Sequence, residues 1–349
     1  MARSVVGIDI GSRSVRAVEV GDSVKAKPTV LRYFEVPLPE GAVSSGEVLE
    51  PNTVAAALRQ LWSEGRFKSR KVVLGIGNQR VLARDLTVPK TTLARIRQSL
   101  PFEVQDMLPV PVAEAVLDFY PIEETVGEHG PMVRGLLLAA VKESVLANVN
   151  AIRLAGLTAI DVDLIPFALS RVLLSRPDVS GTVALVDIGG STTSVLIATD
   201  GVPQFVRIIA TGGDDVTQSL REGLGSQGED PEVMKRRLGL ATGSVAPSDK
   251  MAVEIIYKVA SEQLSILRNT INYFVNTRPI EAVSSIILTG GGAQMEGLPT
   301  ALADQTRLSV VVGDPFVSVT LGSGVDEADI RRRSSALTVA LGLALWRAS

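Results

Sequence analysis

The chain has 349 residues, of which 46% are hydrophobic, and a formal net charge of −3. This length and composition indicate a folded protein of two or more domains and exclude a disordered chain. Because the chain has no cysteine and a single histidine, disulfide bonds, cysteine-ligated metals and histidine-based catalysis are excluded, and a cytoplasmic location is expected. The slight negative charge and the 4% aromatic content argue against nucleic-acid binding. His129 is expected at an exposed loop tip, and the longest apolar run, over 336–346, is too short to span a bilayer.

A glycine-containing hairpin is predicted near the start of the chain. Branched apolar residues over 5–20 predict two buried strands joined by a tight turn. Asp9 stands at the tip of the first strand, and Gly11 allows the backbone to approach a ligand closely. The hydroxyl and amide groups of Ser12 and Ser14 suit phosphate oxygens. Alone this pattern is a weak signal, because such hairpins also occur by chance.

The next elements predict a mixed sheet that is interrupted by an insertion. A strand over 30–36, a helix over 53–62 and a strand over 71–76 continue the first sheet. Residues 85–156 then predict a small α+β subdomain, and a strand over 158–164 rejoins the first sheet. The inserted subdomain is expected to contain strands over 85–89, 115–122 and 135–141 and helices over 91–106 and 144–155.

A second hairpin repeats the order of the first. Residues 183–197 consist of an apolar strand, Asp187, two glycines, hydroxyl residues and a second apolar strand. Two such hairpins suggest a duplicated core with a phosphate held between its halves. Two ordinary glycine hairpins are the alternative, but they would leave the matched Asp9 and Asp187 unexplained.

The last third of the chain is predicted to alternate strands and helices around two more glycine turns. A strand over 204–209 leads to the turn at Gly212 and Gly213, and a strand beginning at Ile286 leads to the turn at Gly290, Gly291 and Gly292. The other predicted elements are helices over 216–222, 231–238, 250–276 and 334–346 and a strand over 308–312. The run Arg331 to Arg333 is expected to be solvated.

The order of these four glycine features resembles the actin-like ATPase superfamily over essentially the whole chain. Glu232, Lys235 and Arg236 match the helix with which chaperone ATPases contact adenosine. The segments 165–169 and 336–343 resemble the two helices that connect the halves of these proteins.

The resemblance implies an α/β fold, with an actin-like (ribonuclease H-like) duplicated core and an inserted small α+β subdomain. The implied divisions are 1–84 with 157–180 for the first core subdomain, 85–156 for the inserted docking subdomain, 181–210 with 281–349 for the second core subdomain, and 211–280 for a helical subdomain at the nucleotide cleft.

Within the superfamily, the chain resembles the FtsA/PilM branch, and PilM-like type IV pilus assembly proteins in particular. The insertion lies where this branch carries its unusual subdomain, whereas actin and MreB carry theirs elsewhere. The motifs over 6–12, 100–104 and 154–169 are similar to the PilM pattern. FtsA ends in an amphipathic membrane helix behind a linker, whereas this sequence stops just after the last core helix.

The resemblance also implies roles for the residues of the glycine features. Asp9 and Asp187 are expected to hold Mg²⁺, mostly through waters, and to form the catalytic group together with Asp163. The residues expected around the ATP phosphates are Gly11, Ser12, Arg13, Ser14, Arg16, Gly189, Gly190, Ser191 and Thr192. Those expected around adenosine are Gly212, Gly213, Glu232, Lys235, Arg236, Gly290, Gly291 and Gly292. Arg16 takes the place of a phosphate-binding lysine in actin.

One departure from the superfamily concerns hydrolysis. Chaperone ATPases carry a water-orienting glutamate where this sequence has Ile165, so ATP hydrolysis is expected to be slow or absent, with ATP acting mainly as a clamp. A sugar or acid kinase is an alternative, for which Asp85 and Asp163 are the nominated bases. A polymerising cytoskeletal ATPase of the FtsA or MreB kind is another.

The resemblance implies partners at the membrane. The expected partner is the N-terminal cytoplasmic peptide of a PilN-like inner-membrane protein, bound beside the inserted subdomain, and contacts with other pilus assembly proteins or self-association are also implied. The protein would then sit at the inner face of the cytoplasmic membrane through its partner. The sequence does not choose between pairing at a strand edge and docking in an apolar groove, and a passive packing role for the insertion is the alternative.

Overall fold

The computed structural model describes residues 4–22, 25–128, 130–176, 178–225, 228–240, 243, 245–278 and 282–346. His129 lies outside these ranges. Within them, no helix is both long and apolar enough to cross a membrane.

The first half is built on a six-stranded sheet with the order β10-β6-β1-β2-β3-β16. Its central strands are antiparallel from β1 to β3 and parallel from β1 to β6 and β10. The strands are β1 (Ser4–Ile10), β2 (Ser14–Gly21), β3 (Thr29–Pro37), β6 (Lys71–Ile76), β10 (Thr158–Leu164) and β16 (Thr320–Leu321). A short hairpin of β4 (Val43–Ser44) and β5 (Glu47–Val48) leads into α1 (Pro51–Glu64).

The second half repeats this design. Its sheet has the order β13-β12-β11-β14-β15, and its strand directions match those of the first sheet position by position. The strands are β11 (Thr182–Ile188), β12 (Thr193–Thr199), β13 (Val202–Ile209), β14 (Val283–Thr289) and β15 (Ser309–Val312). The duplication expected from the two hairpins is therefore present in the fold.

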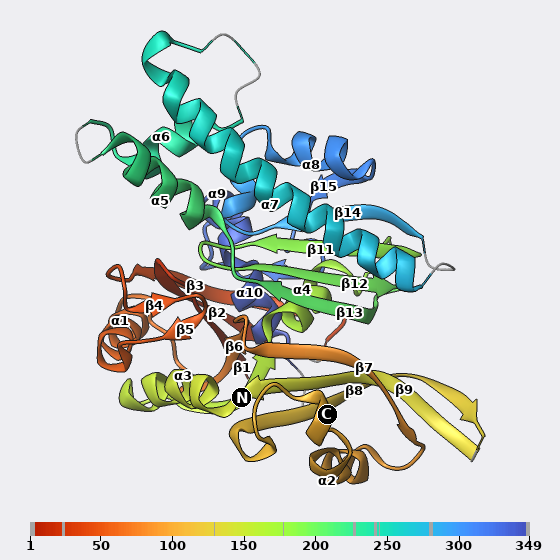
Figure 1. Ribbon diagram of the computed structural model, residues 1–349. Helices are drawn as coiled ribbons and strands as arrows, with labels where there is room; N and C mark the ends of the chain where they lie inside the picture. The colour runs from red at the N-terminus through yellow and green to blue at the C-terminus, as the bar shows by residue number, and fades with distance from the viewer. Residues whose placement is uncertain are drawn as a thin grey trace.

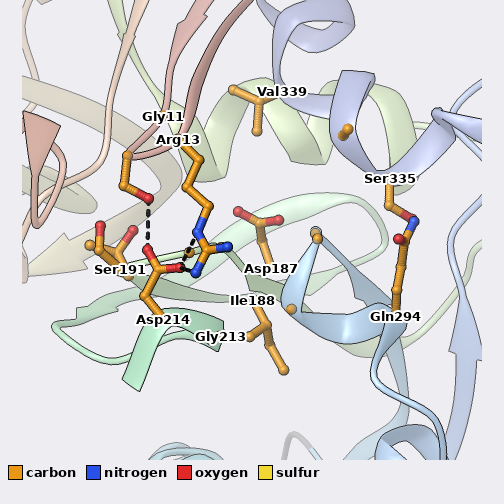
Figure 2. Close-up of a pocket in the computed structure, with 18 of the residues that line it drawn as sticks. Gly11, Arg13, Asp187, Ile188, Ser191, Gly213, Asp214, Gln294, Ser335 and Val339 are labelled. Carbon is orange, nitrogen blue, oxygen red and sulfur yellow. Dashed lines mark hydrogen bonds and ion pairs between the residues drawn. The ribbon is translucent and has the colours of Figure 1, made fainter. Parts of the chain in front are cut away.

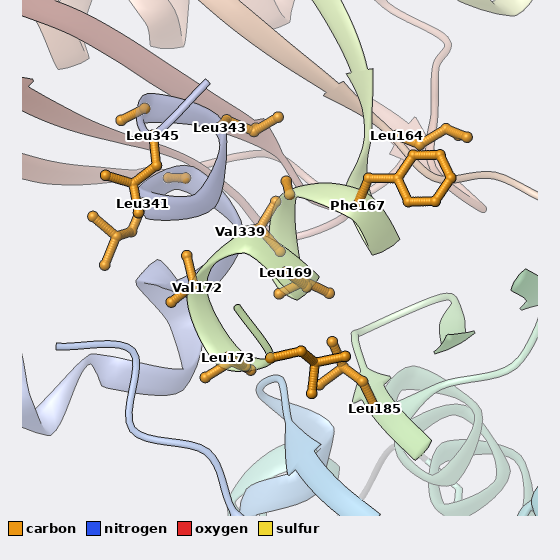
Figure 3. Close-up of a cluster of buried hydrophobic side chains, with 14 of the residues drawn as sticks. Leu164, Phe167, Leu169, Val172, Leu173, Leu185, Val339, Leu341, Leu343 and Leu345 are labelled. Carbon is orange, nitrogen blue, oxygen red and sulfur yellow. The ribbon is translucent and has the colours of Figure 1, made fainter. Parts of the chain in front are cut away.

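Two helices connect the halves and pack between the sheets (Figure 1). Helix α4 (Ile165–Leu173) follows β10 of the first sheet and packs on β12 of the second, whereas α10 (Ser334–Ala344) packs on β1 and β2. Figure 3 shows their leucine, valine and phenylalanine side chains in one buried cluster that both sheets share. The sequence predicted both connecting helices, and the structure confirms them.

A layer of helices covers the second sheet and reaches beyond it (Figure 1). The longest, α7 (Lys250–Thr277), buries an apolar stripe on this sheet, as the sequence predicted. The others are α5 (Gly213–Leu224), α6 (Pro231–Leu238), α8 (Leu298–Thr306) and α9 (Glu327–Arg332), with short 3₁₀ helices over 105–107, 112–114, 247–249 and 292–294. Helix α5 begins at Gly213 and not at Val216, because Asp215 accepts a hydrogen bond from the backbone N–H of Gly212 and caps the first turn.

The inserted subdomain is a three-stranded antiparallel sheet with one helix and a small core of its own. It consists of β7 (Val81–Pro89), α2 (Leu93–Glu103), β8 (Ala115–Gly127) and β9 (Gly130–Val141), in the strand order β7-β9-β8. The β8–β9 hairpin is longer than the expected strands over 115–122 and 135–141, because its register continues to the pair of Gly127 and Gly130.

Helix α3 (Lys142–Leu154), which the sequence assigned to the insertion, packs elsewhere. Its buried Ala151 and Ile152 join the cluster formed by α1 and the first sheet, and Figure 1 places α3 beside α1. The packing therefore favours an inserted unit over 81–141. This unit begins four residues before the expected range of 85–156 and ends before α3.

We predict that the crossing of α4 and α10 tolerates no side chain at Gly342. A Cβ at this position would lie 2.2 Å from the carbonyl oxygen of Ala168. Gly342→Ala would gain about 1 kcal/mol of helix propensity, but the clash with backbone should outweigh it and destabilise the protein by about 2 kcal/mol or more. The measurement is the midpoint of urea unfolding.

The matched control is Gly324→Ala, because a Cβ at Gly324 would have no neighbour within 4 Å. Equal midpoints for the two variants would contradict the close helix crossing.

Candidate functional site

A cleft of about 620 Å³ opens between the two halves, within the range of small-molecule sites. Most of the residues that the sequence nominated line it. They are Asp9, Gly11, Ser12, Arg13, Arg16, Asp187, Gly189, Gly190, Ser191, Thr192, Gly213, Glu232, Lys235, Arg236, Gly290, Gly291 and Gly292.

Three nominated residues are not among those that line the cleft. Ser14 is buried behind its hairpin and donates a hydrogen bond to Glu35 Oε1 at 2.6 Å. Gly212 supports the cleft from behind, where a Cβ would lie 2.3 Å from the carbonyl oxygen of Gly190. Asp163 forms an ion pair with Arg171 on α4. The structure therefore does not bring Asp163 together with Asp9 and Asp187.

The two hairpins enter the cleft with the same turn. The N–H of Gly11 donates to the carbonyl oxygen of Ser14 at 3.0 Å, and the N–H of Gly189 donates to that of Thr192 at 2.9 Å. Each turn follows the central strand of its sheet, so the aspartate in the next-to-last position of β1 and of β11 reaches the cleft. Figure 2 shows Asp187 pointing into the space between the walls.

Burial raises the pKa of both aspartates. Loss of water around Asp187, together with the negative charge of Asp9, raises the pKa of Asp187 to about 7. Burial also raises the pKa of Asp9, and Arg16, whose Nη1 lies 3.0 Å from Asp9 Oδ2, partly offsets this effect. Two carboxylates in this arrangement fit a hard cation such as Mg²⁺. Since no group of three or more acidic or histidine ligands gathers in the described ranges, waters and ligand oxygens would complete its shell.

Side chains join the two halves directly at the first hairpin. Ser12 Oγ donates to Asp214 Oδ2 at 2.9 Å, and Arg13 forms an ion pair with Glu232 at 2.9 Å. Arg13 also forms an ion pair with Asp214 (Figure 2). Gly190 lies directly below this contact, because a Cβ there would approach Ser12 Oγ to 2.4 Å. A larger residue at this point of the second hairpin would therefore displace the side chains of Ser12 and Asp214.

Helix α6 holds a charged cluster against the cleft. Asp230 caps the helix by accepting from the N–H groups of Glu232 and Val233. Glu232 pairs with Lys235 at 2.7 Å and Arg236 at 2.9 Å. The pKa of Glu232 falls to about 2 because hydrogen bonds and nearby cations outweigh its burial.

The sequence missed several residues of the cleft wall. Asp214 follows the predicted glycine turn directly and could have been nominated from its place at the start of α5. Glu35, Gln263 and Ser335 come from distant elements and carry no local motif, whereas Gln294 lies two residues after Gly292 in the predicted glycine turn. Arg332 and Arg333 are exposed, as expected, and they also line the cleft.

Comparison with known proteins identifies the family of this chain. The family model described as "Type IV pilus assembly protein PilM" matches residues 7–348. The chain belongs to this family. Among solved structures, a PilM–PilN type IV pilus biogenesis complex contains a chain that is 28% identical, with a TM-score of 0.83 over 98% of this chain and 97% of that chain.

More distant relatives agree with an actin-like fold. The cell division protein FtsA of Bacillus subtilis is 22% identical over 353 residues, which cover 89% of this chain and 78% of FtsA. MreB5 of Spiroplasma citri, solved with AMPPNP, is 12% identical and superposes with a TM-score of 0.52 over 98% of this chain and 95% of that chain. At this identity the likeness shows the fold alone, and the expected α/β actin-like fold is confirmed.

We predict that Glu232 stabilises the folded protein in a pH-dependent way. Its pKa is about 2 in the folded protein against an ordinary value of 4.5, so its stabilisation is complete well above pH 4.5 and is lost as the pH falls toward 2. Glu232→Gln should lower the free energy of unfolding by about 2 kcal/mol at pH 7, and by about 1 kcal/mol less at pH 4.

Urea unfolding at both pH values measures the difference. Glu327→Gln is the control, because Glu327 forms an exposed pair with Arg331 and should change stability by less than about 0.5 kcal/mol. A Glu232→Gln effect that is independent of pH would contradict the account.

Proposed function

We propose that this protein binds Mg-ATP between its two halves and uses the bound nucleotide to set the geometry of a scaffold in type IV pilus assembly. The observation that carries the proposal is the pair of glycine hairpins with identical turns, each preceded by an aspartate that reaches the same cleft. Backbone N–H groups in such turns suit phosphate oxygens, and two carboxylates suit the accompanying cation.

The remaining walls suit the rest of the nucleotide. Lys235 donates to the carbonyl oxygen of Gly213 at 2.9 Å, which fixes its ammonium group beside the glycine turns. Gly291 has no atom within 4 Å of a hypothetical Cβ, so its backbone leaves open space where a flat base can approach. Met295 and Leu298 add apolar surface beside this space.

The residues that line the cleft give little support for ATP hydrolysis. Ile165 stands in the wall and offers no group to orient a water. Of the two carboxylates nominated as kinase bases, Asp163 is paired with Arg171 and Asp85 lies on the inserted subdomain, paired with Arg278. These pairs favour a nucleotide clamp over a kinase.

We also propose that the inserted subdomain docks the N-terminal segment of a PilN-like membrane protein. The support is membership of the PilM family together with a related chain solved in a PilM–PilN complex. The subdomain exposes large apolar side chains, among them Phe102 on α2 and Val116 on β8, which a partner peptide could cover. Through this partner the protein would reside at the inner face of the cytoplasmic membrane.

The first prediction concerns the cation. Asp187→Asn removes one of the two carboxylates and should weaken Mg-ATP binding about tenfold or more, because the cation loses part of its anionic surroundings. Isothermal titration calorimetry measures the affinity, with the exposed Asp304→Asn on α8 as control. Unchanged affinity in Asp187→Asn would refute the proposed cation site, and no ATP binding by the wild type would refute the nucleotide site.

The second prediction concerns turnover. The purified protein should release phosphate from Mg-ATP more slowly than about 0.1 per second, because Ile165 stands where chaperone ATPases carry the water-orienting glutamate. A coupled phosphate assay measures the rate. Steady release at tens of molecules per second would contradict the clamp.

The third prediction concerns the partner. A photo-crosslinking amino acid at Phe102 or Val116 should capture a synthetic peptide with the N-terminal sequence of a PilN-like protein. The matched control position is Val312, which is also exposed but lies on β15 of the second half. If the peptide is captured at Val312 and at neither Phe102 nor Val116, the docking surface does not lie on the inserted subdomain.

A further inference from the structure

The inserted subdomain contacts the second half of the molecule through four polar side chains. Gln204 on β13 is buried, and its Oε1 accepts from Arg134 Nη2 on β9 at 2.9 Å and from Arg278 Nη1 after α7 at 3.2 Å. Asp85 on β7 forms an ion pair with Arg278 and lies 3.6 Å from Arg134. Asp85, Arg134, Gln204 and Arg278 are called the bridging cluster below.

The charges of the bridging cluster make Asp85 its central member. Two guanidinium groups converge on one amide oxygen, and they would repel each other without a carboxylate between them. Arg134 has a second partner in Glu123, at 2.7 Å. Arg278 is held against the ring of Phe274, with 5.4 Å between its guanidinium carbon and the ring centre. Asp85 is thus the group through which the insertion holds Arg278.

The two elements of the second half that hold the bridging cluster, β13 and α7, both extend to the cleft. Strand β13 carries Gln204 and runs into the turn at Gly212. Helix α7 reaches the same turn, because Gln263 Nε2 donates to the carbonyl oxygen of Gly212 at 2.7 Å. Gln263 lies about 22 Å from Arg278 along this helix. In turn, Gly213 donates to the carbonyl oxygen of Gly189 at 2.9 Å in the second hairpin.

The insertion is also fixed to the cleft from the first half. Strand β7 begins four residues after Gly77, which lines the cleft and packs beneath Ile165. Asn78 Nδ2 donates to Ser144 Oγ at 3.2 Å and ties the outgoing chain to the returning chain. The inserted subdomain is therefore connected to both walls of the cleft: to one through the chain that leaves Gly77, and to the other through the bridging cluster and the two elements, β13 and α7, that extend from it.

We propose that the bridging cluster couples the cleft to the inserted subdomain, so that a nucleotide which changes the angle between the halves also changes the position and mobility of β7 and β9. This inference rests on the proposed function, because it takes Mg-ATP as the ligand of the cleft. By linkage, a partner that binds the insertion in one position would favour nucleotide binding in the matching state.

Hydrogen–deuterium exchange of the full-length protein, with and without Mg-ATP, tests the coupling. In the wild type, Mg-ATP should slow exchange in β7 and β9 about threefold or more. Asp85→Ala should remove most of this effect, while its Mg-ATP affinity, measured by calorimetry, stays within about threefold of the wild type. Asp85→Glu keeps the carboxylate and should restore the effect.

Asp118→Ala is the matched control, because Asp118 pairs with Arg97 inside the insertion and should leave the response to Mg-ATP intact. Unchanged exchange in β7 and β9 while calorimetry detects binding would overturn the coupling and leave the nucleotide site standing. A response in Asp85→Ala equal to that of Asp118→Ala would also overturn it. Failure of the wild type to bind ATP would refute both the proposed function and the coupling.

Discussion

The chemistry of the cleft depends on two carboxylates, one from each half, that face the same space. Asp9 and Asp187 stand near the ends of the central strands of two sheets with matching order. Burial, together with the nearby negative charge of Asp9, raises the pKa of Asp187 to about 7. The fold tolerates this cost because α4 and α10 hold both sheets around one apolar cluster. A cation between the carboxylates would convert the repulsion into attraction, which is why this cleft suits a nucleotide that carries Mg²⁺.

Three kinds of contact set the angle between the halves. Deep in the molecule, Gly7 and Gly342 allow α10 to approach the first sheet and α4 at backbone distance. At the first hairpin, Arg13 reaches Asp214 across the cleft. Farther out, Gln204 accepts a hydrogen bond from Arg134 of the insertion. The apolar contact is rigid, whereas the two polar contacts can break without opening a core. Under the proposed coupling, a ligand in the cleft would act mainly on the polar contacts.

Much of this fold and site could be predicted from the sequence, because the glycine turns and apolar strands are local signals. The two hairpins, the connecting helices and the α6 motif all appeared in the expected order and around one cleft. Residues without a local motif were missed, such as Gln263 and Ser335, because only tertiary packing brings them to the wall. Asp163 was nominated from its charge and its place in the sequence, but Arg171 on the next helix holds its carboxylate. Helix α3 was assigned to the insertion because sequence order cannot reveal which core a helix packs on.

The central claim is that the cleft binds Mg-ATP between the two hairpins, and a crystal structure of the protein with Mg-ATP tests it most directly. The account predicts the triphosphate between the turns at Gly11 and Gly189, with the cation facing Asp9 and Asp187 and the base beside Gly291. Nucleotide bound outside the cleft, or phosphates that contact neither turn, would contradict it.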